Sequence, residues 1–315
     1  MESGFLFSPY KNTSDKPIWI EPDVLFKNGD FLSGNKHWIE HKSHIPVNEI
    51  EEPQCIDKNE YVRKIDNLKG EFRDGKLQKA VFTRAFKTNM NGWTRKALFN
   101  ALIAKYPQAF VYMVNLPGGL SWIGASPETL LTVENDSIET MALAGTRRKS
   151  DHLVQWGEKE IEEQHFVEQH VEDVFRSFGL AFRKEGPLTH QTGGEIEHLR
   201  TVYQTGNSKI STSELLNKLH PTPAVCGLPV ALSGEWLEKN EGYNRSYYSG
   251  FLGPINMNGT SNLFVNLRCA RIHGDVATIY VGGGITETSD PQLEWAETEL
   301  KSRTLLNIIE SKLKI

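Results

Sequence analysis

Closely spaced strand-like segments in the first half of the chain place the strongest limit on the folds that this sequence can adopt. They read "AFVYMVNL", "LSWIGA", "TLLTVEND" and "SIETMALAG", and together they occupy most of residues 109–145. Only a few residues, such as the PGG at 117–119, separate one segment from the next. Parallel strands need a crossover of a dozen or more residues, whereas antiparallel strands can be joined by a tight turn. The sequence therefore predicts antiparallel sheets.

Apolar residues at helical spacing predict helices before and after these strands. The helices are expected at about 93–105, 157–178, 213–219 and 291–313. Further strands are expected at 79–88 and in a hairpin, in which "NLFVNLRCARI" (262–272) and "VATIYVGGGI" (276–285) flank the turn HGD. The predicted fold class is α/β (α+β), with antiparallel sheets packed together and helices outside, and it is not a Rossmann fold.

The size and composition of the chain fit one soluble domain. It has 315 residues without a repeat or a long linker, so a single large core is the default expectation. The net charge of −5 argues against a nucleic-acid-binding protein, which usually presents a basic surface. No apolar run approaches the roughly 18 residues of a membrane span, and the first residues lack the pattern of a secretory signal. Cys55, Cys226 and Cys269 show no metal or redox spacing, so we expect reduced thiols in a cytoplasmic protein.

Two glutamates share one face of the last predicted helix, in "SDPQLEWAETELKS" (289–302). The Ser-Asp pair can cap this helix and the proline suits its first turn, which leaves Leu293 to face inward. Glu294 and Glu297 stand three residues apart, where like charges repel by a few tenths of a kcal/mol. From this segment alone the simpler interpretation is a solvated face on which Lys301 forms a surface ion pair.

A second pair of glutamates, Glu160 and Glu163, has the same spacing in the long helix at 157–178. It lies on a face distinct from the apolar stripe of that helix, and a solvated face is again the simpler interpretation. Two such pairs on different helices could also converge on a hard divalent cation. Magnesium prefers oxygen ligands and keeps several waters, whereas zinc would favour histidine or cysteine.

Short segments in a fixed order resemble the chorismate-utilising enzymes, and among them the isochorismate synthases. The resemblance covers residues 77–310, and its specificity lies in the order and spacing of the segments together. They read "KAVFTR", "GASPETLL", "ALAGTRR", "EIEEQHFVEQHV", "HLRT", "LHPTPAVCGLP", "NRSYYSGFLG", "FVNLRCARI" and "VGGGITETSDPQLEWAETELK". It implies antiparallel sheets with the active site between them, and residues 61–315 are expected to form the chorismate-binding catalytic domain. Residues 1–60 are the least patterned part of the chain and are expected to form an N-terminal lead-in within the same domain.

The resemblance assigns the four paired glutamates to a magnesium site. Glu160 and Glu163 match one E-x-x-E motif of the family, and Glu294 and Glu297 match the other. The implied Mg²⁺ bridges to the ring carboxylate of chorismate, with Glu163 and Glu297 as the expected direct ligands. Glu299 has no such match and is expected to stay on the surface.

The reaction that the resemblance implies moves a hydroxyl group from C4 to C2 of chorismate, which gives isochorismate. Water adds at C2 while the C4 hydroxyl leaves, so the reaction needs a general base and a general acid. The matching positions are Lys79 for the base and Glu128 for the acid. The lysine must lose its proton near neutral pH and the glutamic acid must keep its own, which requires opposite shifts of their pKa values.

The two carboxylates of chorismate require cationic groups and hydrogen-bond donors. The substrate-binding residues that the resemblance implies are Tyr248, Arg268, Gly282, Gly284, Lys301, Thr146 and His198. Of these, Arg268 stands among apolar neighbours of the predicted strand at 262–272, where a buried structural ion pair is the alternative. Arg147 and Arg148 are interpreted as structural.

Other members of the family remain alternatives. One kind of aminodeoxychorismate synthase carries a lysine nucleophile where this chain has Ala144, and "LHPTPAVCGLP" (219–229) is the pattern of isochorismate synthases. These features disfavour two alternatives. One is amine transfer, as in anthranilate synthase component I, and the other is salicylate synthase, which also eliminates pyruvate. A non-catalytic chorismate-binding protein is a third alternative. We expect a monomer without a glutaminase subunit that serves menaquinone or siderophore synthesis. One departure is "EEQH", where relatives have histidine directly after glutamate, so a role for His165 is in doubt.

Overall fold

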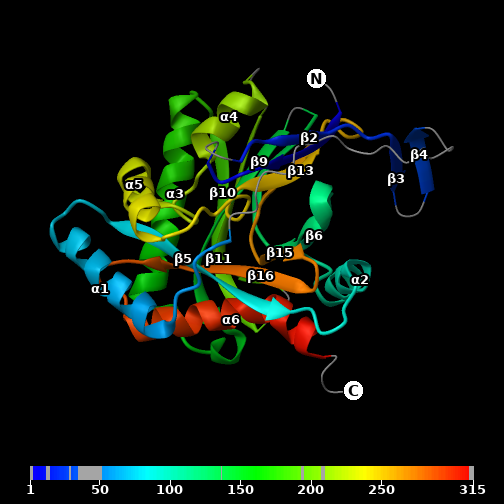
Figure 1. Cartoon of the computed structure of the whole chain (residues 1–315). Helices are drawn as coiled ribbons and strands as arrows, with labels where there is room; N and C mark the ends of the chain where they lie inside the picture. Colours follow the sequence, from blue (N-terminus) through cyan, green and yellow to red (C-terminus); the bar gives the residue numbers. More distant parts are fainter. Residues whose placement is uncertain are drawn as a thin grey trace.

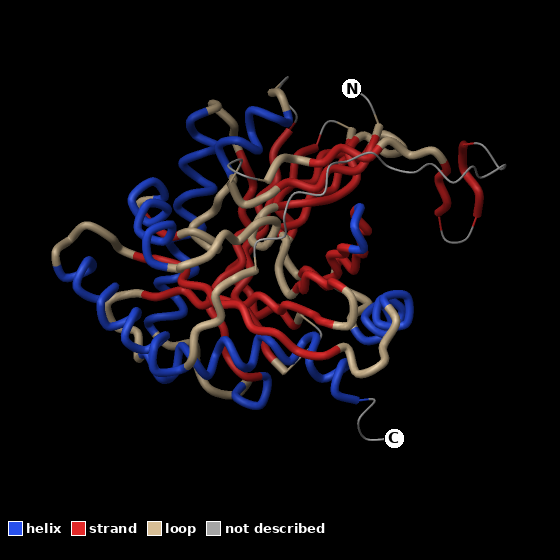
Figure 2. Tube along the Cα trace, viewed as in Figure 1, coloured by secondary structure: helices blue, strands red, loops and turns tan. Residues whose placement is uncertain are grey.

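Two antiparallel sheets lie at the centre of the protein, and helices cover their outer faces (Figures 1 and 2). The structure is a computed structural model that describes residues 3–11, 15–27, 30–34, 52–135, 137–192, 195–206 and 210–311. Every strand pairing in the two central sheets is antiparallel. The predicted fold class is therefore confirmed.

The larger sheet has eight strands. In spatial order they are β10 (Phe182–Gln191), β11 (Ile196–Gly206), β9 (Ser137–Arg148), β8 (Thr129–Glu134), β14 (Thr260–Val265), β13 (Phe251–Ile255), β1 (Gly4–Ser8) and β2 (Ile18–Ile20). Its far edge is built from the start of the chain, because β1 pairs with β13 and β2 pairs with β1. Part of the N-terminal segment is thus incorporated into this sheet.

The smaller sheet has six strands. In spatial order they are β12 (Gly227–Leu228), β5 (Lys79–Asn89), β16 (Val276–Ile285), β15 (Cys269–His273), β7 (Leu120–Ser126) and β6 (Phe110–Leu116). Two short 3₁₀ turns, η1 (Pro117–Gly119) and η2 (Lys149–Asp151), follow β6 and β9. The strands β3 (Val24–Lys27) and β4 (Asp30–Gly34) form a separate hairpin.

The helices pack on the sheets in two groups. They are α1 (Lys58–Arg73), α2 (Arg95–Lys105), α3 (Glu158–Ser177), α4 (Thr212–Leu219), α5 (Val230–Asn240) and α6 (Pro291–Ile309). Helix α3 packs on β9 and β11 of the larger sheet, and α4 packs against α3 and β8. Helix α6 lies along β16 of the smaller sheet, where α1 and α2 contact it. The four predicted helices are confirmed, and the end predicted for the last one, at 313, lies outside the described residues.

The prediction of one continuous strand at 262–272 is wrong. Residues up to Val265 belong to β14 of the larger sheet, and β15 of the smaller sheet begins at Cys269. Arg268 lies between them with a φ of +50°, a left-handed conformation that non-glycine residues seldom adopt. The turn transfers the chain from one sheet to the other, so Arg268 stands at the junction of the two sheets.

The expectation that Leu293 faces inward is also wrong. Asp290 caps α6 by accepting hydrogen bonds from the backbone N–H groups of Gln292 and Leu293, as the sequence predicts for this pair. The Leu293 side chain is nevertheless 70% exposed, whereas that of Glu294 is only 2% exposed. The first turn of α6 therefore turns a carboxylate toward the protein, where an amphipathic surface helix would place a leucine.

Aromatic side chains fill much of the space between the two sheets. Phe7 of β1 stacks on Tyr247 with ring centroids 4.1 Å apart, and Tyr280 of β16 stacks on both Trp122 and Tyr248. Rings of this kind bury large apolar areas and prefer offset or edge-to-face contacts. This layer holds the sheets together beside the cavity described below.

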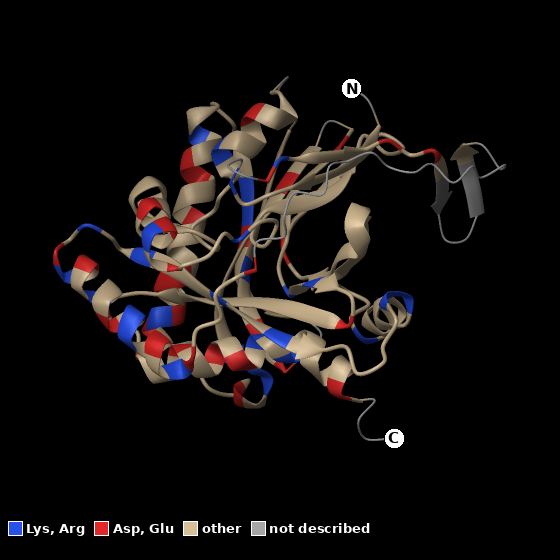
Figure 3. Cartoon of the chain, viewed as in Figure 1, with Lys and Arg blue, Asp and Glu red and all other residues tan. Residues whose placement is uncertain are grey.

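Acidic and basic residues are interspersed along α1 and α6 (Figure 3). This agrees with the small net charge of −5. Within the described part of the chain, no helix combines the length and the apolar character needed to cross a membrane.

Candidate active site

A pocket opens between the two sheets, with a free space of about 680 Å³ when its mouth is included. Strands β9 and β11 supply one wall, β5 and β16 supply the other, and α3 and α6 close one side. Of the residues proposed from the sequence, the pocket is lined by Lys79, Glu128, Thr146, Glu163, His198, Tyr248, Arg268, Gly282, Gly284 and Lys301. Glu160, Glu294 and Glu297 do not line it. A pocket lined by both apolar and converging polar side chains is typical of a small-molecule site.

A bulge at Gly145 shapes one wall of the pocket. In the pairing of β9 with β11, Thr146 faces His198 and Ala144 faces Leu199, so Gly145 is the extra residue. Its φ of +62° is accessible to glycine at little cost, as in bulges of this type. A Cβ atom here would lie 3.1 Å from Glu160 Cβ, so glycine also lets the first turn of α3 approach the strand.

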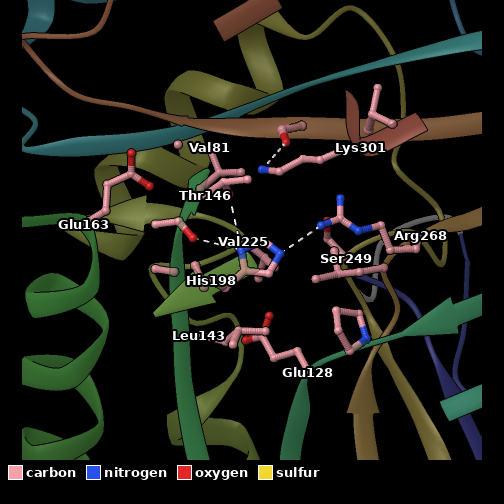
Figure 4. Close-up of a pocket in the computed structure, with 18 of the residues that line it drawn as sticks. Val81, Glu128, Leu143, Thr146, Glu163, His198, Val225, Ser249, Arg268 and Lys301 are labelled. Carbon is pink, nitrogen blue, oxygen red and sulfur yellow. Dashed lines mark hydrogen bonds between the residues drawn. The ribbon is translucent and has the colours of Figure 1, made fainter. Parts of the chain in front are cut away.

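His198 is held between the bulge and Arg268 at the centre of the pocket (Figure 4). Its Nδ1 lies 2.8 Å from the Gly145 carbonyl oxygen, which can only accept a hydrogen bond, so Nδ1 carries the proton. Its Nε2 lies 3.1 Å from Arg268 Nη2, which can only donate. Burial, together with Arg268 and Lys301, lowers the pKa of His198 to about 3. The histidine is therefore neutral and orients the guanidinium group.

Lys79 and Glu128 have pKa values shifted in opposite directions. The Lys79 side chain is 1% exposed at the start of β5, and burial lowers its pKa even though Glu163 Oε2 lies 3.7 Å from Nζ. Glu128 is 3% exposed after β7, and burial raises its pKa to about 8 against the opposing effect of nearby cations. Each group is pushed toward its neutral form, which for lysine is the base and for glutamic acid is the acid.

The three glycines of β16 leave the strand surface bare where charged side chains cross it. A Cβ atom on Gly284 would lie 2.7 Å from Glu163 Oε2 and 2.9 Å from Lys79 Cε. A Cβ atom on Gly283 would lie 3.2 Å from Glu294 Oε2. Any larger residue would displace these groups, because contacts this short are repulsive. The glycines lie inside β16 rather than in a turn at its end.

Cationic side chains approach the pocket from the junction between the sheets and from helix α6. Arg268 enters from the junction between the sheets, and Lys301 enters from α6, where its Nζ lies 3.0 Å from the Gly282 carbonyl oxygen (Figure 4). Tyr248 is buried beside them and stacks on Tyr280 with ring centroids 5.4 Å apart. Arg147 does not line the pocket, since it forms an ion pair with Glu197 at 2.6 Å and lies over the Trp156 ring, which fits the structural role expected of it.

Three of the four glutamates proposed as metal ligands gather next to the pocket. Glu163 and Glu294 each contact the ammonium group of Lys159, and Glu297 forms an ion pair with Lys301 at 2.6 Å. Burial and the adjacent Glu297 raise the pKa of Glu294, whereas Lys301 and Lys159 outweigh burial and lower the pKa of Glu297.

The donor set suits a hard cation, although the side chains do not yet converge on one point. Glu294 Oε2 is buried without a hydrogen-bond partner in the described residues, and such an atom is costly unless a ligand satisfies it. Among these residues, no three His, Cys, Asp or Glu side chains already form a metal cage. Glu160 is set apart, with its carboxylate beside Gly157. Magnesium typically uses one or two protein carboxylates together with waters and an anionic substrate, so Glu163, Glu294 and Glu297 fit it.

Three residues around the pocket were not predicted from the sequence. Lys159 is the most prominent, because an E-x-x-E motif gives no reason to select the lysine before it. Ser249 lines the pocket with a φ of +60°, and its buried hydroxyl group has no hydrogen-bond partner among the described residues. Gln164, which follows Glu163, accepts a hydrogen bond from the Ala144 backbone N–H. It fixes the wall of the pocket from the position where histidine was expected, whereas His165 is exposed.

Comparisons with known proteins place this geometry in a family. A family model described as chorismate binding enzyme matches residues 29–310. Isochorismate synthase EntC of Escherichia coli (strain K12) is 29% identical over 221 residues, which are 67% of this chain and 56% of that protein. The chain therefore spans less than two thirds of the length of this curated relative.

Solved structures show the same fold. The provisionally named 2,3-dihydroxybenzoate-specific isochorismate synthase DhbC of Bacillus anthracis aligns with a TM-score of 0.78 at 26% identity and covers 97% of this chain and 83% of that chain. MenF, the menaquinone-specific isochorismate synthase of Escherichia coli, aligns with a TM-score of 0.69 at 26% identity and covers 84% of this chain and 66% of that chain. Because the family model matches residues 29–310, which are most of this chain, the chain belongs to the chorismate-binding enzyme family.

Proposed function

We propose that the protein is an isochorismate synthase that converts chorismate to isochorismate and depends on Mg²⁺. The observation that carries the proposal is the pair of opposed pKa shifts in one pocket, a lysine pushed toward its neutral form and a glutamic acid whose pKa is raised to about 8. A lysine whose pKa is lowered and a glutamic acid that keeps its proton at pH 7 match a reaction that adds water at one carbon and releases hydroxide at another.

The proposed chemistry uses Lys79 as the base and Glu128 as the acid. Water forms a bond to C2 of the ring and gives a proton to Lys79 Nζ. The bond between C4 and its hydroxyl breaks, the ring double bonds shift between the two carbons, and the departing hydroxyl takes the proton of Glu128 and leaves as water. One water is consumed and one is released. Solvent then returns the proton from the lysine to the glutamate.

The remaining cationic groups fit a substrate with two carboxylates. Arg268 offers a planar set of donors, and the His198 contact at 3.1 Å fixes its orientation. Lys301 offers a point charge from helix α6. Two positive groups on different walls would hold the two ends of chorismate so that its ring lies between the base and the acid.

We propose Glu163, Glu294 and Glu297 as the residues that hold Mg²⁺, with Glu160 in a supporting role. When bound, the ion would neutralise a carboxylate of the substrate and fix its position next to the pocket. Mg²⁺ also accounts for carboxylates beside a pocket that must accept a dianion, since the ion would add positive charge where the carboxylates alone would repel the substrate.

Two sequence features disfavour amine transfer. Ala144 stands where one kind of aminodeoxychorismate synthase carries a lysine nucleophile, which closes that covalent route, and "LHPTPAVCGLP" (219–229) is the pattern of isochorismate synthases. We therefore propose that the protein acts without a glutaminase subunit, as a monomer in the cytoplasm. Solved relatives specific for 2,3-dihydroxybenzoate and for menaquinone have the same sequence identity to this chain, 26% each. We accordingly propose isochorismate, the compound that both kinds of enzyme produce, as the product.

Product analysis tests the proposal. The purified protein is incubated with chorismate and Mg²⁺ without ammonium, and the products are separated by chromatography. We expect isochorismate that approaches a fixed ratio to chorismate, with formation abolished by a chelator. Salicylate with pyruvate would reassign the protein to the salicylate synthases. Turnover only after ammonium is added would reassign it to the amine-transferring enzymes, and no turnover at all would favour a non-catalytic binding protein.

A further inference from the structure

The ammonium group of Lys159 lies inside the cluster of carboxylates. Its Nζ is 2.6 Å from Glu294 Oε1 and 3.2 Å from Glu163 Oε1, so it bridges glutamates from α3 and α6. These two side chains are nearly buried, with 2% and 9% exposed, whereas that of Lys159 is 22% exposed. A bridge from one solvent-accessible lysine to two buried carboxylates is unlike an ordinary surface ion pair, in which all partners remain hydrated.

Each carboxylate of the cluster has an ammonium partner. Glu297 has Lys301 at 2.6 Å, and the second oxygen of Glu163 lies 3.7 Å from Lys79. Lys301 and Lys79 line the pocket, whereas Lys159 does not. Lys159 is therefore the cation of this cluster that has no role in the proposed chemistry.

We propose that Lys159 is a resident cation that neutralises the metal-binding glutamates in the metal-free protein and must move away when Mg²⁺ binds. This inference rests on the proposed Mg²⁺ dependence. A magnesium ion requires ligand oxygens at about 2.0–2.1 Å. An ion held between Glu163 and Glu294 would need the space that the ammonium group now fills, 3.2 Å from Glu163 Oε1 and 2.6 Å from Glu294 Oε1, even though Glu294 Oε2 has no hydrogen-bond partner among the described residues. The repulsion between the two cations would make joint occupancy still less favourable.

The position of Lys159 allows this exchange without a change of fold. It lies in the first turn of α3, and its flexible four-carbon chain can rotate the ammonium group into solvent. Movement of the lysine leaves Glu163 and Glu294 free to turn their oxygens toward one ion. This explains why the glutamates are gathered but do not form a cage in the part of the chain that the structure describes.

Competition of this kind weakens the apparent affinity for Mg²⁺. Binding of the ion must break the two contacts of Lys159 with Glu163 and Glu294. The free energy of these contacts is lost on binding, so the apparent Kd for Mg²⁺ is higher than it would be without the lysine. Removal of the lysine charge should therefore tighten Mg²⁺ binding. The simpler expectation is different, because a lysine near a substrate dianion would ordinarily assist function.

Calorimetric titration of the protein with MgCl₂ alone tests the inference. We expect the apparent Kd for Mg²⁺ to fall at least tenfold in Lys159→Met and in Lys159→Gln, and to change less than twofold in Lys159→Arg, which keeps the cation. The control is Lys76→Met, which removes an exposed lysine paired with Glu71 and Asp74 at the end of α1. Equal Mg²⁺ affinity in wild type, Lys159→Met and Lys159→Gln would overturn the inference.

Thermal unfolding in a chelator gives a second readout that does not depend on activity. Without Lys159 the buried glutamates lose their cation, so the unfolding midpoint of Lys159→Met should fall below that of Lys76→Met, and added Mg²⁺ should raise it more than in wild type. If Lys159→Met binds Mg²⁺ more tightly while wild type makes no isochorismate, the proposed activity fails and the inference stands. If neither wild type nor the Lys159 variants bind Mg²⁺, the inference fails, whatever the product analysis shows.

Discussion

Replacement of Glu128 by glutamine should stabilise the folded protein at alkaline pH while it removes the proposed activity. The Glu128 side chain is 3% exposed, and burial raises its pKa from 4.5 to about 8. Glutamine has nearly the same shape and hydrogen-bonding capacity as the protonated acid but cannot ionise. The variant therefore removes the cost of a buried carboxylate without opening a cavity.

The sign and size of the effect follow from proton linkage. Because the pKa of Glu128 is higher in the folded protein than in the unfolded chain, folding retains a proton that the unfolded chain releases between pH 4.5 and about pH 8. The free energy of unfolding of the wild type therefore falls as pH rises through this window. At 1.36 kcal/mol per pKa unit, the loss approaches roughly 5 kcal/mol above pH 8 and is only about 1 kcal/mol at pH 5.

Urea unfolding of the metal-free protein at pH 5 and at pH 9, followed by tryptophan fluorescence, measures this difference. We expect Glu128→Gln to be more stable than wild type by several kcal/mol at pH 9 and by about 1 kcal/mol at pH 5. Glu235→Gln, an exposed position on α5, is the matched control and should show no such pH dependence. Turnover should fall by about 100-fold or more, because glutamine cannot donate the proton. A stability difference that is the same at both pH values would refute the reasoning.

Three other substitutions test separate parts of the site. Lys79→Ala should reduce turnover of chorismate by about 10²–10⁴-fold while Mg²⁺ binding by calorimetry persists, and normal turnover would rule out this lysine as the base. Arg268→Lys should raise the KM for chorismate about tenfold or more with a smaller effect on kcat, because an ammonium group cannot reproduce two parallel contacts to a carboxylate; an unchanged KM would contradict that role. Gln164→Leu should lower the free energy of unfolding by roughly 2–4 kcal/mol in urea, because it leaves buried polar partners on β9 unsatisfied, and a change below about 0.5 kcal/mol would contradict the proposed contact.

Local patterns in the sequence were sufficient for most of the secondary structure. The segments between 109 and 145 became β6, β7, β8 and β9, since their short connections leave only antiparallel pairing. Helix α1 was not predicted, although Tyr61, Ile65, Leu68 and Phe72 are buried on one face at helical spacing. That pattern was available in the sequence and could have identified the helix.

The break at Arg268 was beyond such patterns. Both halves of 262–272 are apolar and resemble one strand, and only the fold shows that they belong to different sheets. The same limit applies to α6, where the buried side of the first turn carries Glu294 and the exposed side carries Leu293. A periodicity argument assumes that the buried face is apolar, and this fails where a helix faces a polar cluster.

The sequence by itself determined the antiparallel connectivity, the cap of α6 and the membership of the family, because these depend on neighbouring residues or on the order of short motifs. Only the tertiary structure decided the charge state of the site. The pKa values of Lys79 and Glu128 depend on burial by strands from both sheets, and the pairing of Lys159 with Glu294 joins helices that are more than a hundred residues apart. Desolvation and Coulomb energy depend on distance in space rather than on distance along the chain.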